Sequence, residues 1–110
     1  MSHSCWHGGL PIYEVRQALP PLEAGDDSAS ALVMFFSYYT HWKWFASEFD
    51  GDEIFFGVVD GFEVEYGYFT LSELAAYRGR YGAPIERDPS FTPKRLREIY
   101  LELRGSRSIR

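Results

Sequence analysis

The chain has 110 residues, which suits one domain and is too short for two. Hydrophobic residues make up 45% and charged residues 25%, so the composition excludes a disordered, collagen-like or membrane-spanning chain. The net charge of -5 argues against direct binding of nucleic acid, and we expect a single domain over residues 1–110 with flexible tails at 1–9 and 106–110.

The first predicted elements are a helix and a strand. Pro11 suits the first position of a helix that runs to Leu19, because the apolar residues after it recur at helical spacing. Pro20 ends this helix. A strand is predicted over Ala31–Tyr39, where β-branched and aromatic residues favour an extended backbone.

Two Asp-Gly dipeptides, Asp50-Gly51 and Asp60-Gly61, give the clearest local signal. Asp-Gly favours a two-residue hairpin turn because both residues tolerate the positive φ that the turn requires. We therefore predict a meander whose three strands are His41–Phe49, Asp52–Val59 and Phe62–Phe69.

Two-residue turns would fix the register of this meander. Trp44 would then face Gly57, where the missing side chain leaves room for the indole, and Gly57 would face Val64. The other face is expected to be only partly covered. On this register the core face consists of Trp42, Trp44, Ala46, Phe55, Val59, Phe62, Val64, Tyr66 and Tyr68.

The last third of the chain predicts two helices and an edge strand. The segment Thr70–Glu73 has the spacing of a capping box, so a helix is expected from Leu71 to Arg78. Ile85–Asp88 is expected to form a short edge strand. A final helix should begin at Pro93 and end at Gly105.

These elements predict an α+β fold. We expect an antiparallel sheet of four or five strands, built around the meander with its two Asp-Gly turns, and two or three helices packed mainly on one face.

Cysteine usage indicates a reduced compartment. Cys5 is the only cysteine, which excludes an intrachain disulfide, and no signal-peptide pattern precedes Gly9, so we expect a cytoplasmic protein that does not bind membranes. The only metal-like cluster combines Cys5 with His3 and His7, in a segment with no predicted structure to organise it. We expect no metal and no cofactor.

The charge is divided unevenly along the chain. Residues 1–93 hold five basic and fourteen acidic residues, whereas residues 94–110 hold six basic and two acidic ones. Such an acidic surface serves solubility or attracts a basic partner. The carboxylates that we expect to lie away from the aromatic core, and so to contact a protein partner, are Asp50, Asp52, Glu53, Asp60, Glu63 and Glu65.

No catalytic motif is present. The sequence has no phosphate-binding glycine loop and no serine elbow. One alternative remains open, in which the carboxylates of Glu48, Glu86 and Asp88 serve a small enzyme or nuclease accessory, with a divalent ion. Because such carboxylates more often accept structural hydrogen bonds, we expect no enzyme.

Several pieces between Trp42 and Leu96 are similar to a known family. They are Trp44-Phe45-Ala46-Ser47-Glu48, Phe55-Phe56-Gly57-Val58-Val59, Glu65-Tyr66-Gly67-Tyr68-Phe69-Thr70-Leu71-Ser72-Glu73-Leu74, Arg78-Gly79, Pro84-Ile85-Glu86-Arg87-Asp88, Phe91 and Pro93. With these pieces the chain resembles the bacterial family catalogued as domain of unknown function 2958. It departs from the family at Ala46 and Ser47, where an isoleucine-threonine pair is preferred.

The resemblance implies a setting rather than an activity. It implies an origin in plasmids, phages and other mobile elements, near anti-restriction genes, and no activity is established for the family. We predict that Arg87 pairs with Glu48 or Glu73. We interpret the family's motif residues as structural; they are Trp44, Glu48, Gly57, Gly67, Glu73, Arg78, Glu86 and Arg87.

Three functional hypotheses follow. The first is a small acidic, non-enzymatic protein-binding module that inhibits a host nucleic-acid-dependent defence system, of anti-CRISPR or anti-restriction type, by occupying a nucleic-acid site as a DNA mimic. The second is the enzyme or nuclease accessory described above. The third is a structural partner of toxin–antitoxin type. The oligomeric state is left open.

Overall fold

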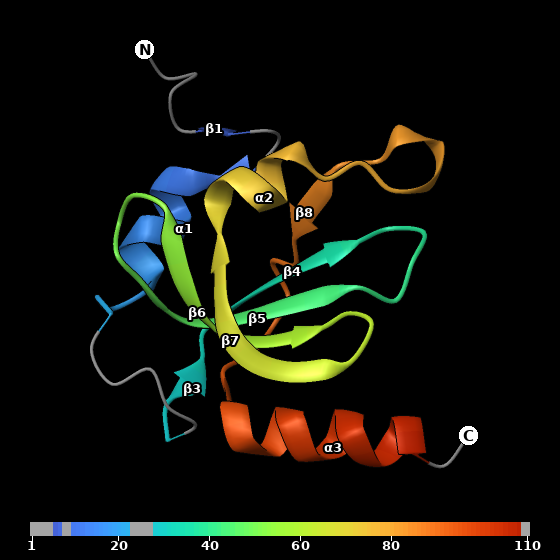
Figure 1. Ribbon diagram of the computed structural model, residues 1–110. Coiled ribbons are helices and arrows are strands. Elements are labelled where there is room, and N and C mark those ends of the chain that lie inside the picture. The colour runs from blue at the N-terminus through green and yellow to red at the C-terminus, as the bar shows by residue number, and fades with distance from the viewer. Residues whose placement is uncertain (1–5, 8–9, 23–27, 109–110) are drawn as a thin grey trace.

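A computed structural model describes residues 6–7, 10–22 and 28–108 of the chain (Figure 1). The helices of this part are α1 (Ile12–Ala18), α2 (Leu71–Ala76), the short 3-10 helix η2 (Arg80–Gly82) and α3 (Leu96–Ser108). The strands are β1 (Trp6–His7), β2 (Leu10–Pro11), β3 (Ser30–Ala31), β4 (Val33–Ser37), β5 (Lys43–Phe49), β6 (Ile54–Asp60), β7 (Val64–Thr70), β8 (Ile85–Arg87) and β9 (Lys94–Arg95).

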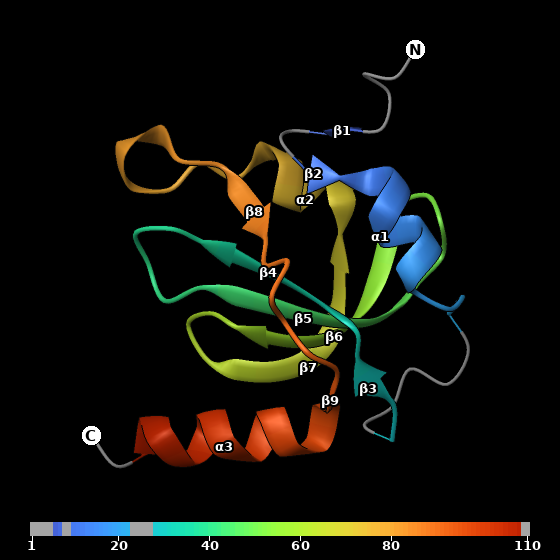
Figure 2. The same ribbon diagram turned by 180° about the vertical axis from the view of Figure 1, so that it is seen from behind.

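The central sheet has five antiparallel strands in the order β7-β6-β5-β4-β8. Strands β4 to β7 form a meander, and β8 returns to lie beside β4 at the opposite edge from β7 (Figure 2). Two further pairs, β1 with β2 and β3 with β9, are short. The α+β fold with a five-stranded antiparallel sheet and an edge strand after Pro84 is thus confirmed.

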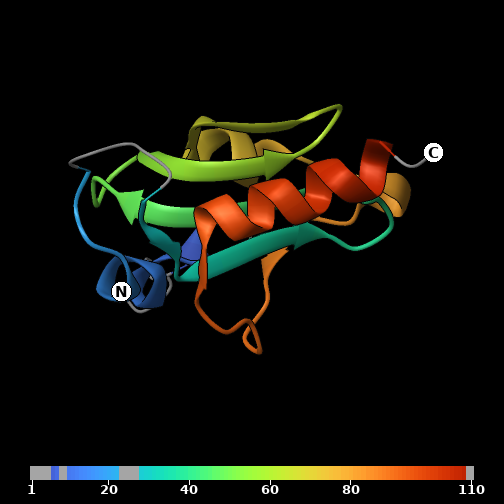
Figure 3. The same cartoon turned by 90° about the horizontal axis from the view of Figure 1, so that it is seen from below.

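Both faces of the sheet are buried. Helices α1 and α2 cover one face, where Phe35, Phe55 and Leu74 belong to the larger core cluster. Helix α3 covers the other face and packs on Phe56 and Val58 (Figures 1 and 3). Two of the three α-helices therefore share one face as expected, but the second face is not the partly covered surface that we predicted, because α3 lies across it.

The register between β5 and β6 differs from the predicted one. Trp44 pairs with Val59, and Ala46, not Trp44, pairs with Gly57. The cause is a turn longer than two residues, in which the Asp50 amide donates to the Ile54 carbonyl at 2.9 Å. In addition, a bulge at Ser47 shifts the pairing between Ala46 and Glu48.

The second turn is also longer than predicted, and this exchanges the faces of β7. Asp60 pairs with Val64, so three residues, 61–63, form the turn instead of two. Because side chains alternate along a strand, the odd shift moves Val64 and Tyr66 to the α3 face and brings Phe69 to the α1/α2 face. Phe62, which we expected in the core, is 86% exposed in the turn.

A glycine does make room for an indole, but the pair is a different one. A Cβ at Gly61 would overlap the ring of Trp42. At Gly57 the obstacle is backbone, since a Cβ there would overlap the carbonyl oxygen of Phe45. Gly57 therefore allows close approach of β5 at the bulge rather than space for Trp44.

Helices α2 and α3 form where the sequence predicts them, but they begin or end at different residues from those predicted. The capping box of α2 is confirmed: the Thr70 hydroxyl accepts from the Glu73 amide at 3.1 Å and the Glu73 carboxylate accepts from the Thr70 amide at 3.2 Å. Helix α2 ends at Ala76. Helix α3 begins only at Leu96, because the residues before it pair with β3, and it continues past Gly105.

The paired glycines of β6 and β7 give a test of this register. Gly57→Ala should lower the free energy of unfolding by about 3 kcal/mol or more, because the new methyl group meets the backbone of Phe45. Gly67→Ala is the matched control: Gly67 pairs with Gly57 but has nothing within 4 Å of its Cβ position, so its stability should change by less than about 1 kcal/mol. Equal effects in denaturant unfolding would contradict the register.

Candidate functional site

The six carboxylates predicted to contact a partner lie at opposite ends of the meander. Asp50, Asp52 and Glu53 are in the β5–β6 turn, and the other three are in or beside the β6–β7 turn. Strand β6 has seven residues, so the two groups are separated by roughly 20 Å. The structure does not bring the six together as one acidic face.

The β5–β6 turn is held by its own carboxylates. The Oδ1 atom of Asp50 accepts hydrogen bonds from the amides of Asp52, Glu53 and Ile54 at 2.8, 2.8 and 3.0 Å. These amides, that of Glu53 first, hold the pKa of the Asp50 carboxyl below its ordinary value. The carbonyl and carboxylate of Glu53 accept from the amides of Leu71 and Ser72, which fixes the start of α2.

Removing the Asp50 carboxylate should therefore weaken the fold. Asp50→Ala should lower the free energy of unfolding by roughly 1–2 kcal/mol near neutral pH, whereas Asp52→Ala, at an exposed side chain in the same turn, should have little effect.

The difference between wild type and Asp50→Ala should depend on pH. Because the folded pKa lies below the ordinary value of 3.8, the stabilisation is complete above 3.8 and is lost as the pH falls through the folded pKa. Urea unfolding of both proteins from neutral to strongly acidic pH measures this loss, and a difference that persists unchanged in acid would contradict it.

At the other end of the meander, the carboxylates differ in burial. Asp60 is only 4% exposed, which removes it from any partner surface. Glu63 and Glu65 are exposed, and no hydrogen bond or ion pair joins either carboxylate to another residue in the part of the chain that the structure describes.

Three connecting segments meet at this end, which we call the loop end: residues 38–42, 61–63 and 77–84. A ring nitrogen of His41 lies 2.7 Å from the Gly61 carbonyl oxygen and so joins the first two segments. The rings of Tyr39 and Tyr81 meet edge to face at 5.1 Å and join the first to the third. The large exposed side chains of the loop end are Tyr38, Tyr39, Phe62 and Tyr81.

The backbone of the loop end is strained at one of these aromatics. Tyr81 has φ 63° and ψ 18°, the left-handed region that favours glycine, and its side chain is 82% exposed. A bulky residue in that conformation costs about 1 kcal/mol or more, and such strain concentrates at functional sites. An exposed aromatic in a strained backbone is unexplained by stability alone.

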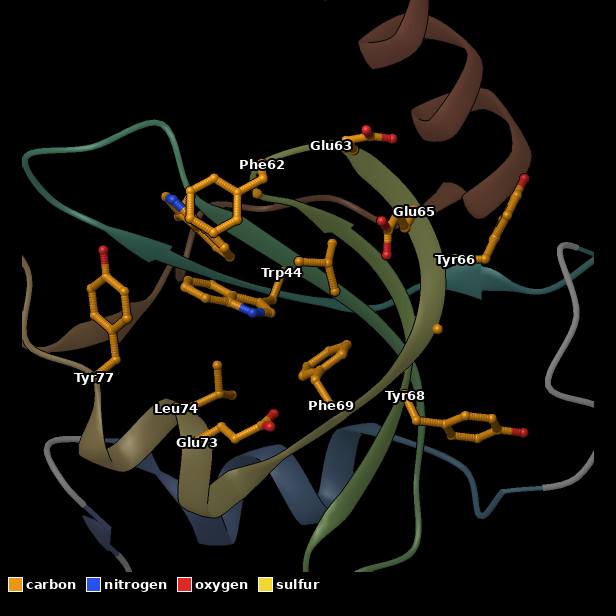
Figure 4. A pocket seen from close by; sticks show the side chains of 14 residues that line it. Trp44, Phe62, Glu63, Glu65, Tyr66, Tyr68, Phe69, Glu73, Leu74 and Tyr77 are labelled. Atoms are coloured by element: carbon orange, nitrogen blue, oxygen red, sulfur yellow. The ribbon is translucent and has the colours of Figure 1, made fainter.

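A groove of about 400 Å³ runs from the loop end toward α2 (Figure 4). Trp42 is its hub: the indole lies 5.1 Å from the Phe62 ring, 5.7 Å from the Trp44 ring and 6.5 Å from the Tyr77 ring, between centroids. The Trp44 and Tyr77 rings meet edge to face at 5.8 Å. The aromatic wall of the groove is thus one contacting set.

The groove is acidic as well as aromatic. Figure 4 shows the carboxylates of Glu65, on β7, and Glu73, on α2, on either side of Phe69, with Leu74 between Glu73 and the aromatic wall. Tyr66 and Tyr68 point away from it. Among the described residues that line the groove, none is Lys or Arg.

The carboxylates of the enzyme alternative are not all brought together. Glu86 and Asp88 line a second cavity, of about 670 Å³, beside Lys43, but Glu48 is buried on β5 and does not line it. Asp88 already has a structural role, because its carboxylate accepts from the Ser90 amide at 2.9 Å.

The predicted partners of Arg87 are wrong. Its guanidinium lies 3.6 Å from the carboxylate of Glu14 on α1. The Glu73 carboxylate instead accepts from the Thr70 amide in the capping box, and no ion pair joins it to Arg87 among the described residues. Glu48 pairs with Phe56 on the α3 face, whereas Arg87 pairs with Phe35 on the face of α1.

The Arg87 ion pair should contribute little to stability. The Glu14 side chain is 68% exposed, and solvent screens such pairs, so Glu14→Gln should change the free energy of unfolding by less than about 1 kcal/mol. A loss of several kcal/mol in urea unfolding would show a buried, unscreened pair instead.

Among the remaining motif residues, Arg78 has a local structural role. The Arg78 guanidinium donates to the carbonyls of Ala75 and Tyr77 at 2.7 Å and so caps the end of α2. The exposure of the aromatic side chains of the loop end was not predicted from the sequence. Phe62 and the two tyrosines after β4 stand next to turn residues, and aromatic side chains at such positions seldom belong to the core.

Comparison with known proteins identifies the family to which the chain belongs. The family profile described as "Protein of unknown function (DUF2958)" matches residues 15–108. The chain belongs to this family. Neither the curated proteins nor the solved structures contain a match.

Two features are absent from the described residues. None of the helices in residues 6–7, 10–22 and 28–108 is long and apolar enough to cross a membrane. Within the same residues, no group of three or more His, Cys, Asp or Glu side chains is arranged to hold a metal ion. His3 and Cys5 lie outside them.

Proposed function

We propose that this chain is a non-enzymatic protein-binding module and that the loop end is its binding surface. The observation that carries the proposal is that three connecting segments at one end of the sheet expose four aromatic side chains, Tyr38, Tyr39, Phe62 and Tyr81. Tyr and other aromatic residues are enriched in the buried centres of protein interfaces, where they supply much of the binding energy.

The position of these residues supports binding rather than stability. Phe62 and Tyr81 are more than four-fifths exposed, so they bury little surface in the folded chain. The acidic groove beside them adds charge to an apolar patch. An apolar patch rimmed by polar groups is typical of an interaction site.

We further propose that the partner carries a basic surface and is a nucleic-acid-binding protein of a host defence system. The acidic balance of the chain before α3 supports this, because a negative surface speeds association with a basic groove. Inhibition would then follow from occupation of the site that DNA or RNA otherwise fills.

Site-specific crosslinking tests the binding surface. A photoreactive benzoylphenylalanine at position 62 should capture a partner from a lysate of the source cells, and one at Leu101, an exposed site on α3, should not. In the complex so identified, Phe62→Ala and Tyr81→Ala should each weaken binding by about tenfold.

The matched control for these variants is Tyr13→Ala, which removes an exposed tyrosine from α1 and should leave binding unchanged. Capture from Leu101 alone, or equal losses in all three variants, would place the binding surface elsewhere.

Competition tests the proposed class of partner. DNA or RNA should compete with this protein for the partner, and added salt should weaken the complex, since the Debye length is about 8 Å at physiological ionic strength. Simultaneous binding of nucleic acid and this protein, insensitive to salt, would overturn occupation of the nucleic-acid site.

A further inference from the structure

We infer that the groove between the β6–β7 turn and α2 receives an arginine side chain of the partner. This inference deepens the proposed function and rests on it. The groove combines an aromatic wall with inward carboxylates, and the chemistry that satisfies both is a flat cation.

The aromatic wall is suited to a cation. The ring centroid of Trp42 lies 5.1 Å from that of Phe62 and 6.5 Å from that of Tyr77, at interplanar angles of 83° and 44°. All three side chains line the groove. A cation above a ring face is attracted by the ring quadrupole, most strongly for tryptophan.

Two carboxylates line the groove on either side of Phe69, Glu65 on β7 and Glu73 on α2. Glu65 alternates with Gly67 and Phe69 along β7 and shares their face, so its carboxylate is directed into the groove. Its oxygens accept no hydrogen bond from the other residues that the structure describes. Among the described residues, Glu73 accepts a side-chain hydrogen bond only from the Thr70 amide, through Oε1, so Oε2 is left for a ligand.

The shape of this site favours guanidinium over ammonium. A guanidinium is planar, stacks on aromatic faces, loses hydration readily and donates in a fork that matches a carboxylate. A lysine ammonium is compact and strongly hydrated, and gains less from the same wall. The volume of about 400 Å³ is in the range of ligand clefts, roughly 300–1,000 Å³.

Gly67 keeps the groove open. Nothing lies within 4 Å of its Cβ position, so the strand between Glu65 and Phe69 has a gap over which an incoming side chain can lie. Two tryptophans in the wall, Trp42 and Trp44, provide an intrinsic fluorescence signal for occupancy.

The test uses the full chain and N-acetyl-arginine amide as the probe. Titration should change the tryptophan fluorescence and shift the amide NMR signals of β7 and the β6–β7 turn, with saturation. N-acetyl-citrulline amide has the same shape without the charge and should bind at least about fivefold more weakly. The lysine and trimethyllysine amides should also bind more weakly than arginine.

Charge-matched variants locate the site. Glu65→Gln should weaken arginine binding by about fivefold to tenfold, and Phe62→Ala should weaken it similarly, while Asp52→Asn, at an exposed carboxylate of the opposite turn, should not. Both groove side chains are exposed, so thermal unfolding should show that each variant remains folded.

Three results would overturn the inference: no arginine-dependent shift at the highest soluble concentration, equal binding of citrulline, or tighter binding of trimethyllysine. The failures are distinguishable. If crosslinking at position 62 captures the partner but arginine does not bind, the protein-binding function stands without the arginine pocket. If arginine binds at the groove but loop-end variants retain the partner, the proposed function fails.

Discussion

The close approach of β5 and β6 at Gly57 is the constraint on which the register of these two strands, and the faces of their side chains, depend. At this point β5 carries its bulge, and the Phe45 carbonyl occupies the space of a side chain at position 57. The bulge turns Phe49 toward α1 and α2, where it stacks on Phe55 at 4.2 Å. The register that follows sets which side chains of β5 and β6 share each face of the sheet, and hence places Trp42 and Trp44 at the groove.

The elements could be predicted from the sequence, but the register between them could not. Periodicity and capping located α2 and the stripe of α3 because those signals are local. An Asp-Gly pair marks a turn without fixing its length. Asp50 instead accepts from three amides in a longer turn, and the three-residue turn after Asp60 reverses β7. The groove therefore could not be assembled from the sequence, although Trp42 and Phe62 were predicted to share one face of the meander.

The carboxylates divide into structural and accessible ones, and composition alone does not separate them. At the β5–β6 turn, Asp50 and Glu53 accept backbone hydrogen bonds, and the Arg16 guanidinium donates to the Gly51 carbonyl at 2.6 Å, so this end ties α1, α2 and the sheet together. At the other end, the carboxylates of Glu63 and Glu65 accept no hydrogen bond from another described residue. The net charge of the chain therefore overstates the negative charge that is accessible to a partner.

The position of the basic helix keeps the groove negative. Lys94, in β9 just before α3, pairs with Glu102 of the helix at 2.6 Å. Arg104 of α3 lies over the Tyr100 ring, 5.5 Å from its centroid. Helix α3 packs on the face of the sheet opposite the aromatic wall. The sheet thus separates the basic side chains of α3 from Glu65 and Glu73 and prevents direct pairing within one chain. Among the described residues that line the groove none is Lys or Arg, so a cation brought by another molecule would meet unopposed carboxylates there, with the exposed aromatics of the loop end beside it.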